Sequence, residues 1–108
     1  MEILPTLIQK KNNGKYLLIH FDDNSKYSIS SVLLRVESPS ADIQGHGGPK
    51  TIVRNKRNVL IDQIEPVGNY AIRIIFSDNH SSGIYSWHLL HDFGINHDKY
   101  LKAYYNSL

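Results

Sequence analysis

The sequence predicts an α+β fold: an antiparallel sheet built from hairpins, with two or three short helices packed on one face. Two pairs of apolar runs, each pair separated by a polar or glycine-containing turn, indicate the hairpins. Two Leu-Leu segments that follow serines indicate helices. A length of 108 residues suits one compact domain, which we expect to span residues 1–108.

The first hairpin is predicted over residues 16–29. Leu17, Ile19 and Phe21 alternate with other residues, so they share one face of a strand. The Asp-Asp-Asn-Ser sequence at 22–25 suits a turn, and Lys-Tyr-Ser-Ile then returns along the first strand.

A short helix is expected directly after this hairpin. The hydroxyl of Ser30 or Ser31 can accept a hydrogen bond from an amide of the first turn, and Val-Leu-Leu at 32–34 follows. The helix should end before Pro39, because the residue before a proline disfavours helical backbone.

A second hairpin is predicted from residues 58–66 and 70–76, which are rich in β-branched and other apolar residues. Gly68 and Asn69 lie between them and tolerate a positive φ, as a tight turn requires. Residues 77–83 then form another polar turn before a short strand at Ile84 and Tyr85.

Two helices are expected in the last quarter of the chain. Ser86 should cap the first, Gly94 should end it in the left-handed conformation, and Asn96 should begin the second. We expect Phe76 and Trp87 to anchor the core. The residues expected on the packed sides of these helices are Trp87, Leu89, Leu90, Phe93, Tyr100, Leu101, Tyr104, Tyr105 and Leu108.

The two hairpins resemble each other in sequence. Ile-His-Phe-Asp-Asp-Asn at 19–24 and Ile-Ile-Phe-Ser-Asp-Asn at 74–79 match at four positions, and both lead into a Leu-Leu helix. This similarity indicates either a duplicated hairpin-then-helix unit or two uses of a common local solution.

Composition excludes several classes of protein. There is no cysteine, so the chain has no disulfide, thiolate metal site or cysteine nucleophile. The net charge of +2 gives no strong long-range field, and no apolar run approaches the ~20 residues of a membrane helix. We therefore expect a cytoplasmic protein, either a monomer or a homodimer, that binds neither nucleic acid nor membrane.

Three segments carry a resemblance to a known family. They are Ser-Pro-Ser-Ala-Asp-Ile-Gln-Gly-His-Gly at 38–47, Val-Gly-Asn-Tyr at 67–70 and Asp-Asn-His-Ser-Ser-Gly-Ile-Tyr-Ser-Trp at 78–87. Together they resemble the N-terminal domain of gamma-butyrobetaine hydroxylase, a family that also occurs as free-standing bacterial proteins. Related domains are appended to oxygenases and to iron–sulfur-cluster carrier ATPases. The resemblance therefore implies an accessory role beside metallocofactor proteins.

The resemblance also implies a zinc site that this sequence has altered. In the hydroxylase domain, three cysteines of one loop and a later histidine hold the ion. Here Ser38 and Ser40 stand in that loop, and His80 aligns with the histidine. A serine hydroxyl is a poor zinc ligand, so we expect no cofactor. The alternative is a metal held by His80 and His46, with Asp42 as a third ligand.

The loop from Ser38 to Pro49 is the first candidate for binding a protein partner. Its glycines allow close approach of backbone to a partner, but their spacing is not that of a phosphate-binding loop. The alternative is a loop that packs on its own domain, with the hydroxyls of Ser38 and Ser40 fastening it and His80 hydrogen-bonding it. The candidate contact residues are Ser38, Ser40, Gln44, Gly45, His46, Gly47, Tyr70 and Tyr85.

Other candidate sites lack a full set of groups. His20 and Asp22 have the spacing of an iron pair, but we expect His20 on the solvent face of the hairpin. His88 and His91 stand three apart with no third ligand, and an exposed helix face explains them.

A basic cluster follows the loop, made of Lys50, Arg54, Lys56 and Arg57. It lacks interleaved aromatic residues and is interpreted as a solvated turn.

Three hypotheses for function remain. The first is a non-catalytic accessory domain that docks an unidentified protein partner through the glycine-rich loop and the region from Tyr70 to Trp87. The second is a metal-binding module that uses His80 and His46. The third is a small enzyme, which the sequence disfavours because it offers only separated histidines.

Overall fold

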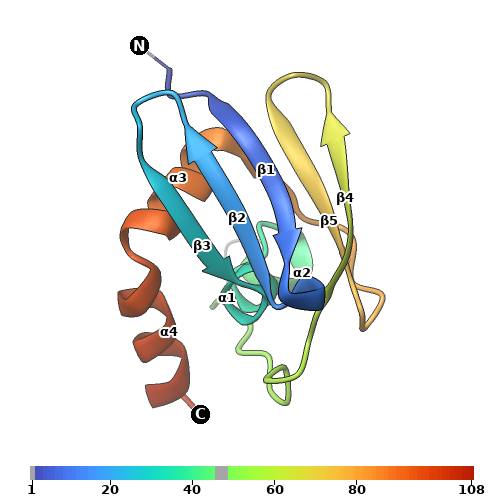
Figure 1. Ribbon diagram of the computed structural model, residues 1–108. Coiled ribbons are helices and arrows are strands. Elements are labelled where there is room, and N and C mark those ends of the chain that lie inside the picture. Colours follow the sequence, from blue (N-terminus) through green and yellow to red (C-terminus); the bar gives the residue numbers. More distant parts are fainter. Residues whose placement is uncertain (1, 46–48) are drawn as a thin grey trace.

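The computed structural model describes residues 2–45 and 49–108, and Figure 1 shows their arrangement. The first half contains β1 (Pro5–Lys11), a 3-10 turn η1 (Asn12–Gly14), β2 (Tyr16–Phe21), β3 (Lys26–Ser30), α1 (Ser31–Val36) and α2 (Ala41–Gln44). The second half contains β4 (Ile61–Val67), β5 (Ala71–Phe76), β6 (Ile84–Ser86), α3 (Trp87–Ile95) and α4 (His97–Asn106).

The strands form two antiparallel sheets of three strands each, in the orders β1-β2-β3 and β4-β5-β6. The mixed α+β fold and both expected hairpins are confirmed. The sequence analysis missed β1, which pairs with β2 along the edge of the first sheet. Its lysines and its proline at the first position suit an edge strand, but they hide the alternation by which a strand is recognised.

The two halves repeat one local design. The Phe21 amide donates to the Ser25 carbonyl at 2.9 Å, and the Phe76 amide donates to the His80 carbonyl at 3.0 Å. Within these turns, Asn24 and Asn79 have φ angles of 69° and 70°. A register irregularity next to the first residue of both β1 and β4 extends the similarity beyond the turn. The repeated unit is therefore a three-stranded meander followed by a helix.

Serine caps begin the helix that follows each meander. The Ser30 hydroxyl accepts a hydrogen bond from the Val32 amide at 3.1 Å, and the Ser86 hydroxyl accepts one from the Leu89 amide at 3.1 Å. Both caps were predicted, because a serine side chain can satisfy an otherwise unpaired first-turn amide. α1 also ends before Pro39, as expected.

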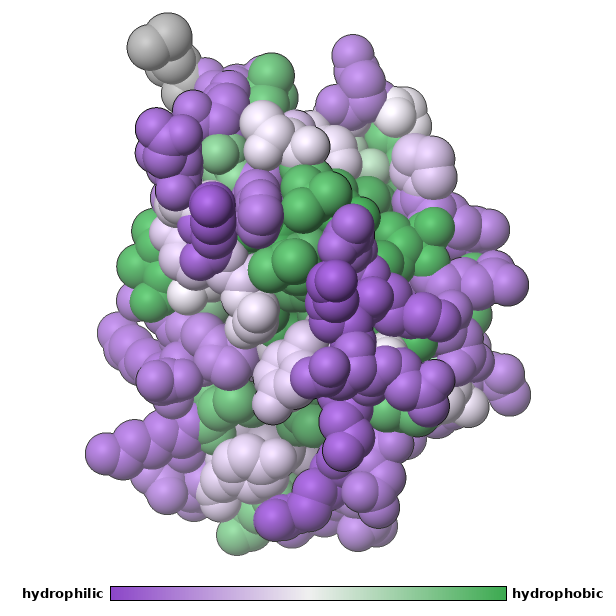
Figure 2. Space-filling model, in the orientation of Figure 1, coloured by the Kyte–Doolittle hydropathy of each residue, from purple (hydrophilic) through white to green (hydrophobic). Residues whose placement is uncertain are grey.

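One hydrophobic core lies between the sheets and helices. β2 and β3 contribute Leu17, Ile19, Phe21 and Ile29, α1 contributes Val32, Leu33 and Leu34, β5 contributes Ile72, Ile74 and Phe76, and α3 contributes Leu90 and Phe93. α3 crosses behind the first sheet in Figure 1. In Figure 2, apolar surface gathers near the middle of the face between β1 and β4, with hydrophilic side chains around it.

One expectation about the helices, at Gly94, was wrong. Gly94 lies inside α3, which continues to Ile95, and a Cβ atom at Gly94 would lie 2.4 Å from Cγ of Tyr27. The glycine is therefore explained by close packing rather than by a left-handed helix end. Asn96 begins α4 as its N-cap residue, as expected, but its side chain makes no capping hydrogen bond and its amide instead donates to Asp92 at 2.8 Å.

Trp87 was also placed too deep. Phe76 is buried as expected, but Trp87 is only partly buried at the edge of the core. Its indole nitrogen donates to the carbonyl of Asn69 at 3.0 Å, which holds the ring over the β4–β5 turn. An indole N–H needs a partner, and this requirement keeps the ring at the boundary of the core.

Candidate functional site

The turn between β5 and β6 meets the segment after α1 at a histidine–serine cluster formed by Ser38, Ser40 and His80. His80 Nε2 lies 2.9 Å from the Ser38 hydroxyl oxygen and 3.5 Å from that of Ser40. Both serines are buried. Gly83 allows this approach, because a Cβ atom there would lie 2.3 Å from the Ser38 oxygen.

Further hydrogen bonds fix the cluster from behind. The side-chain amide of Gln44 donates to the Ser38 carbonyl at 3.0 Å. The hydroxyl of Tyr85 donates to the Leu34 carbonyl at 2.5 Å, and burial raises the pKa of Tyr85. A neutral buried phenol is a structural donor here, since ionising it would remove the hydrogen bond.

An ion-pair group stands beside the cluster. Arg35 Nε and Lys56 Nζ lie 2.8 and 2.7 Å from Oδ2 of Asp78. Burial raises the pKa of Asp78, but the hydrogen bonds from Lys56 and Arg35 outweigh burial and lower this pKa to about 2. Asp78 is therefore ionised at neutral pH and ties α1 to the β5–β6 turn.

Electrostatics favour the neutral form of His80. Burial lowers the pKa of His80, and the positive charge of Arg35 lowers it further, while Asp78 and Asp42 act in the opposite direction. A neutral imidazole can form a hydrogen bond with the Ser38 hydroxyl without burying a charge. The predicted hydrogen-bonded histidine is thus present, with a serine hydroxyl as its partner rather than loop backbone.

The zinc site implied by the resemblance does not fit these residues. Hydroxyl groups stand beside the one imidazole, and a hydroxyl is not deprotonated near neutral pH. Within residues 2–45 and 49–108, no three histidine, aspartate or glutamate side chains are placed to share an ion. Asp42 acts on the pKa of His80 through its charge alone, and His46 lies outside the described residues.

The expected contact residues have different environments. Ser38, Ser40 and Tyr85 are buried, so they support the fold from inside and do not form a contact surface. Gln44 is exposed and Gly45 is partly exposed, while His46 and Gly47 lie outside the described residues.

Tyr70 is 60% exposed, but it precedes β5, whereas the cluster follows that strand. Six strand residues span ~20 Å, so the loop and Tyr70 lie at opposite ends of β5. Tyr70 therefore lies far from Ser38 and Ser40 among the described residues, and the docking surface itself stays a prediction.

A hollow beside α4, which we call the α4 cavity, was not anticipated. It has a volume of about 610 Å³ and lies between the chain that follows the glycine-rich loop and the side of α4. Ile52, Lys50 and Lys99 are among its lining residues, and Ile52 is 48% exposed. The apolar residues after Pro49 and the tyrosine spacing in α4 were its only signals in the sequence.

Hydrogen bonds and an ion pair hold the walls of this cavity. The Tyr104 hydroxyl donates to the Val53 carbonyl at 2.5 Å, joining α4 to the opposite wall. Lys50 pairs with Glu37, and burial lowers the pKa of Lys50.

A serine and an aspartate of the β2–β3 turn also meet a histidine of α3, without catalytic geometry. His91 Nε2 lies 3.2 Å from Asp23 and 3.5 Å from the Ser25 hydroxyl. A catalytic triad uses both ring nitrogens, one for each partner, whereas here a single nitrogen faces both. His91 is partly buried, and the centre of its ring lies 4.9 Å from that of Phe21. The exposed position expected for both His88 and His91 is therefore confirmed only at His88.

The iron pair suggested by spacing is explained structurally. His20 is partly buried on β2, and an Asp22 carboxylate oxygen accepts a hydrogen bond from the Leu4 amide at 3.2 Å.

No helix in the part of the chain that the structure describes is long and apolar enough to cross a membrane.

Comparison with known proteins gives the family. The family model described as "Gamma-butyrobetaine hydroxylase-like, N-terminal" matches residues 8–91, which include all but the first residues of β1 in the first meander, the whole second meander and the histidine–serine cluster. The chain belongs to this family. No curated protein matches the sequence.

Solved structures agree with this assignment. A protein solved by NMR is 39% identical, with a TM-score of 0.84, and the alignment covers 99% of this chain and 80% of that one. A second NMR structure is 34% identical, with a TM-score of 0.83 and coverages of 97% and 83%.

A crystal structure from Acidithiobacillus ferrooxidans is described as a protein of unknown function in the DUF971 family. It is 29% identical, with a TM-score of 0.70 and coverages of 83% and 91%. Membership of this gamma-butyrobetaine hydroxylase-like N-terminal family therefore establishes the fold without naming an activity.

Proposed function

We propose that this chain is a non-catalytic accessory domain that docks a protein partner at the α4 cavity, beside the glycine-rich loop. The observation that carries the proposal is the position of the cavity. The chain that leaves the loop forms one wall of the 610 Å³ hollow, and α4 forms the other. A concave, partly apolar surface next to a loop on a rigid base is a common form of binding site.

The base of the loop is firmly held. The Thr51 amide donates to the Ile43 carbonyl at 2.7 Å, which brings the two ends of the loop together, and Ile43 is buried. The histidine–serine cluster fixes the preceding residues. A loop with a fixed base presents its tip and flanks with little loss of backbone entropy on binding.

The family guides the choice of partner. Because related domains are appended to oxygenases and to iron–sulfur-cluster carrier ATPases, we expect the partner to be a metallocofactor protein. A metal-binding or enzymatic role has less support, since the donors beside His80 are hydroxyls, while His91 and His97 lie in separate structural contacts.

A photo-crosslinking residue at Ile52 tests the docking site. Ile52 lines the cavity and is exposed, whereas the control position, Thr6, is exposed on β1 of the first sheet. We expect a discrete crosslinked adduct in native cells from position 52 and none from position 6. Equal adducts from both positions, or none from either, would contradict the proposal.

A matched pair of variants on α4 provides the second measurement. Ala103 lines the cavity and Lys102, its neighbour, does not. We expect Ala103→Trp to abolish the adduct at position 52 and Lys102→Trp to retain it, with both melting temperatures near that of the parent. Metal content measured on the same untagged protein separates this function from a metal-binding module, which requires stoichiometric metal that is lost in His80→Ala.

A further inference from the structure

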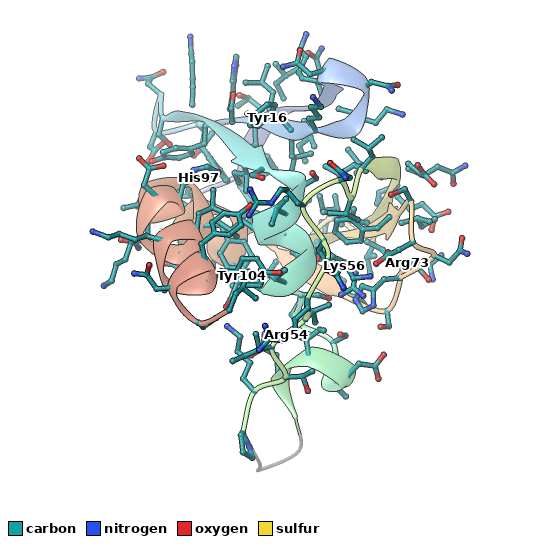
Figure 3. All side chains as sticks on the ribbon, turned by 90° about the horizontal axis from the view of Figure 1, so that it is seen from below. Tyr16, Arg54, Lys56, Arg73, His97 and Tyr104 are labelled. Carbon is teal, nitrogen blue, oxygen red and sulfur yellow. The ribbon has the colours of Figure 1, made fainter. Side chains whose placement is uncertain are left out.

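A second concave surface lies beyond Tyr104, on the side seen in Figure 3. It consists of two adjoining hollows of about 450 and 340 Å³, which share Arg57, Asn58 and Tyr105. Lys15 and Tyr16 line the first hollow, and Lys56 lines the second. No aspartate or glutamate side chain lines either one. We call this surface the basic groove.

The cations of the groove are largely free of partners. Lys56 pairs with Asp78, but in the described residues no carboxylate lies within ion-pair distance of Lys15, Arg54 or Arg57. The other exposed arginine, Arg73, pairs with Glu65 on the second sheet. Unpaired cations gather at this groove even though the chain as a whole carries a net charge of only +2.

Exposed tyrosine rings alternate with these cations. Tyr16 and Tyr105 are 37% and 38% exposed, and the Arg57 guanidinium lies 5.1 Å from the centre of the Tyr105 ring. Arg54 lines neither hollow and precedes Lys56 and Arg57 in the same chain segment. Figure 3 shows Tyr16, Tyr104, Lys56 and Arg54 along this side of the molecule. The aromatic residues that the sequence lacked between its cations are thus supplied by β2 and α4.

We propose that the basic groove binds an acidic, extended peptide segment of a protein partner. Guanidinium and ammonium groups without internal partners can take up carboxylates, and Arg57 can do so with two parallel hydrogen bonds. Tyrosine rings provide rigid contact area for the aliphatic parts of such a peptide. Two hollows in series suit an extended chain better than one compact anion. The proposal rests on the proposed function, because the ligand is part of a protein.

The arrangement favours peptide over single-stranded nucleic acid. Nucleic-acid grooves combine a long basic channel with aromatic faces on which bases stack. Here Arg57 already covers one face of the Tyr105 ring, and two short hollows replace a channel.

Fluorescence anisotropy with a short labelled peptide rich in glutamate tests the proposal on the whole chain. We expect saturable binding that weakens as salt is added, and no binding of the same peptide with glutamine in place of glutamate. Arg57→Gln should weaken binding about tenfold, the loss typical of one charge-assisted contact. The matched control Arg73→Gln removes the same charge elsewhere and should change the affinity by less than about twofold.

Four outcomes would overturn the proposal. They are equal weakening by Arg57→Gln and Arg73→Gln, equal binding of the glutamine peptide, tighter binding of an oligouridylate RNA than of the peptide, and displacement of the peptide by millimolar inorganic phosphate. The result is independent of the crosslink at Ile52. Peptide binding without a crosslink from position 52 would support the basic groove and contradict docking at the α4 cavity. A crosslink without peptide binding would support docking at the α4 cavity alone.

Discussion

The Ser38 hydroxyl is enclosed on two sides, by the imidazole of His80 and by the bare backbone of Gly83. Its position depends on both neighbours. A substitution at either residue should therefore disturb the packing around this oxygen and lower stability, because the cluster is buried and tightly packed.

Gly83→Ala tests this packing. The added Cβ would lie 2.3 Å from the Ser38 oxygen, so we expect a loss of about 1–3 kcal/mol in the free energy of unfolding, measured with urea. The same change made in a Ser38→Ala background should cost clearly less, because the opposing oxygen is gone. Equal costs in the two backgrounds would show that Ser38 and Gly83 do not interact.

His80 should give stability a dependence on pH. Its folded pKa lies below 6.5, the ordinary value for a histidine, so the unfolded chain binds the proton first as pH falls. Its contribution is therefore complete above about pH 6.5 and declines as pH falls towards the lower folded pKa.

Urea midpoints at successive pH values, compared between variants, measure this effect. His80→Gln should flatten the decline below about pH 6.5, and the exposed control His88→Gln should keep it. If the two variants have identical slopes, His80 is not the group responsible.

At the level of the element, α3 shows a packing requirement that overrides helix propensity. Alanine is more favourable than glycine inside a helix by about 1 kcal/mol, yet Gly94 faces the ring of Tyr27. We expect Gly94→Ala to lower stability by about 1–3 kcal/mol, because the Cβ would lie 2.4 Å from the ring. Thermal unfolding of Gly94→Ala with and without Tyr27→Ala measures the clash, and a gain in melting temperature from Gly94→Ala alone would refute it.

Phe76, at the end of β5, should contribute more to the stability of the core than Trp87, at the start of α3. Phe76→Ala should cost about 3–5 kcal/mol, because the ring is fully buried. Trp87→Ala should cost about 1–2 kcal/mol, since the ring is partly exposed and loses one hydrogen bond to Asn69. Chemical denaturation of the two variants tests this order, and a larger loss from Trp87→Ala would reverse our placement.

At the level of the whole molecule, two similar meanders share a single core. Leu17 and Ile19 of the first meander and Ile72 and Ile74 of the second belong to one buried cluster. Neither half can bury these faces alone, so we expect them to unfold together.

Two spectroscopic signals test this cooperativity. Trp87 fluorescence reports on the second half, and far-ultraviolet circular dichroism reports on both halves. Their urea transitions should coincide, with one midpoint for a two-state change. Separated midpoints would indicate halves that fold independently.

The candidate site was predictable only in its parts. His80 and the serines at 38 and 40 were identified from the sequence, yet their contact spans 42 residues and was not evident from local pattern. The tyrosines beside the basic cluster were not evident from local pattern, because Tyr16 and Tyr105 lie far from Arg57 in sequence and line the same hollow only when β2 and α4 pack beside it.

The sequence by itself determined the features that depend on neighbouring residues. It gave the hairpin turns at Asn24 and Asn79, the serine caps at 30 and 86, and the family, since turn conformation and capping involve atoms only a few residues apart. Tertiary structure alone decided the use of Gly94, the α4 cavity and the basic groove. Each of these depends on which distant surfaces meet, and that choice is made by burying one shared core.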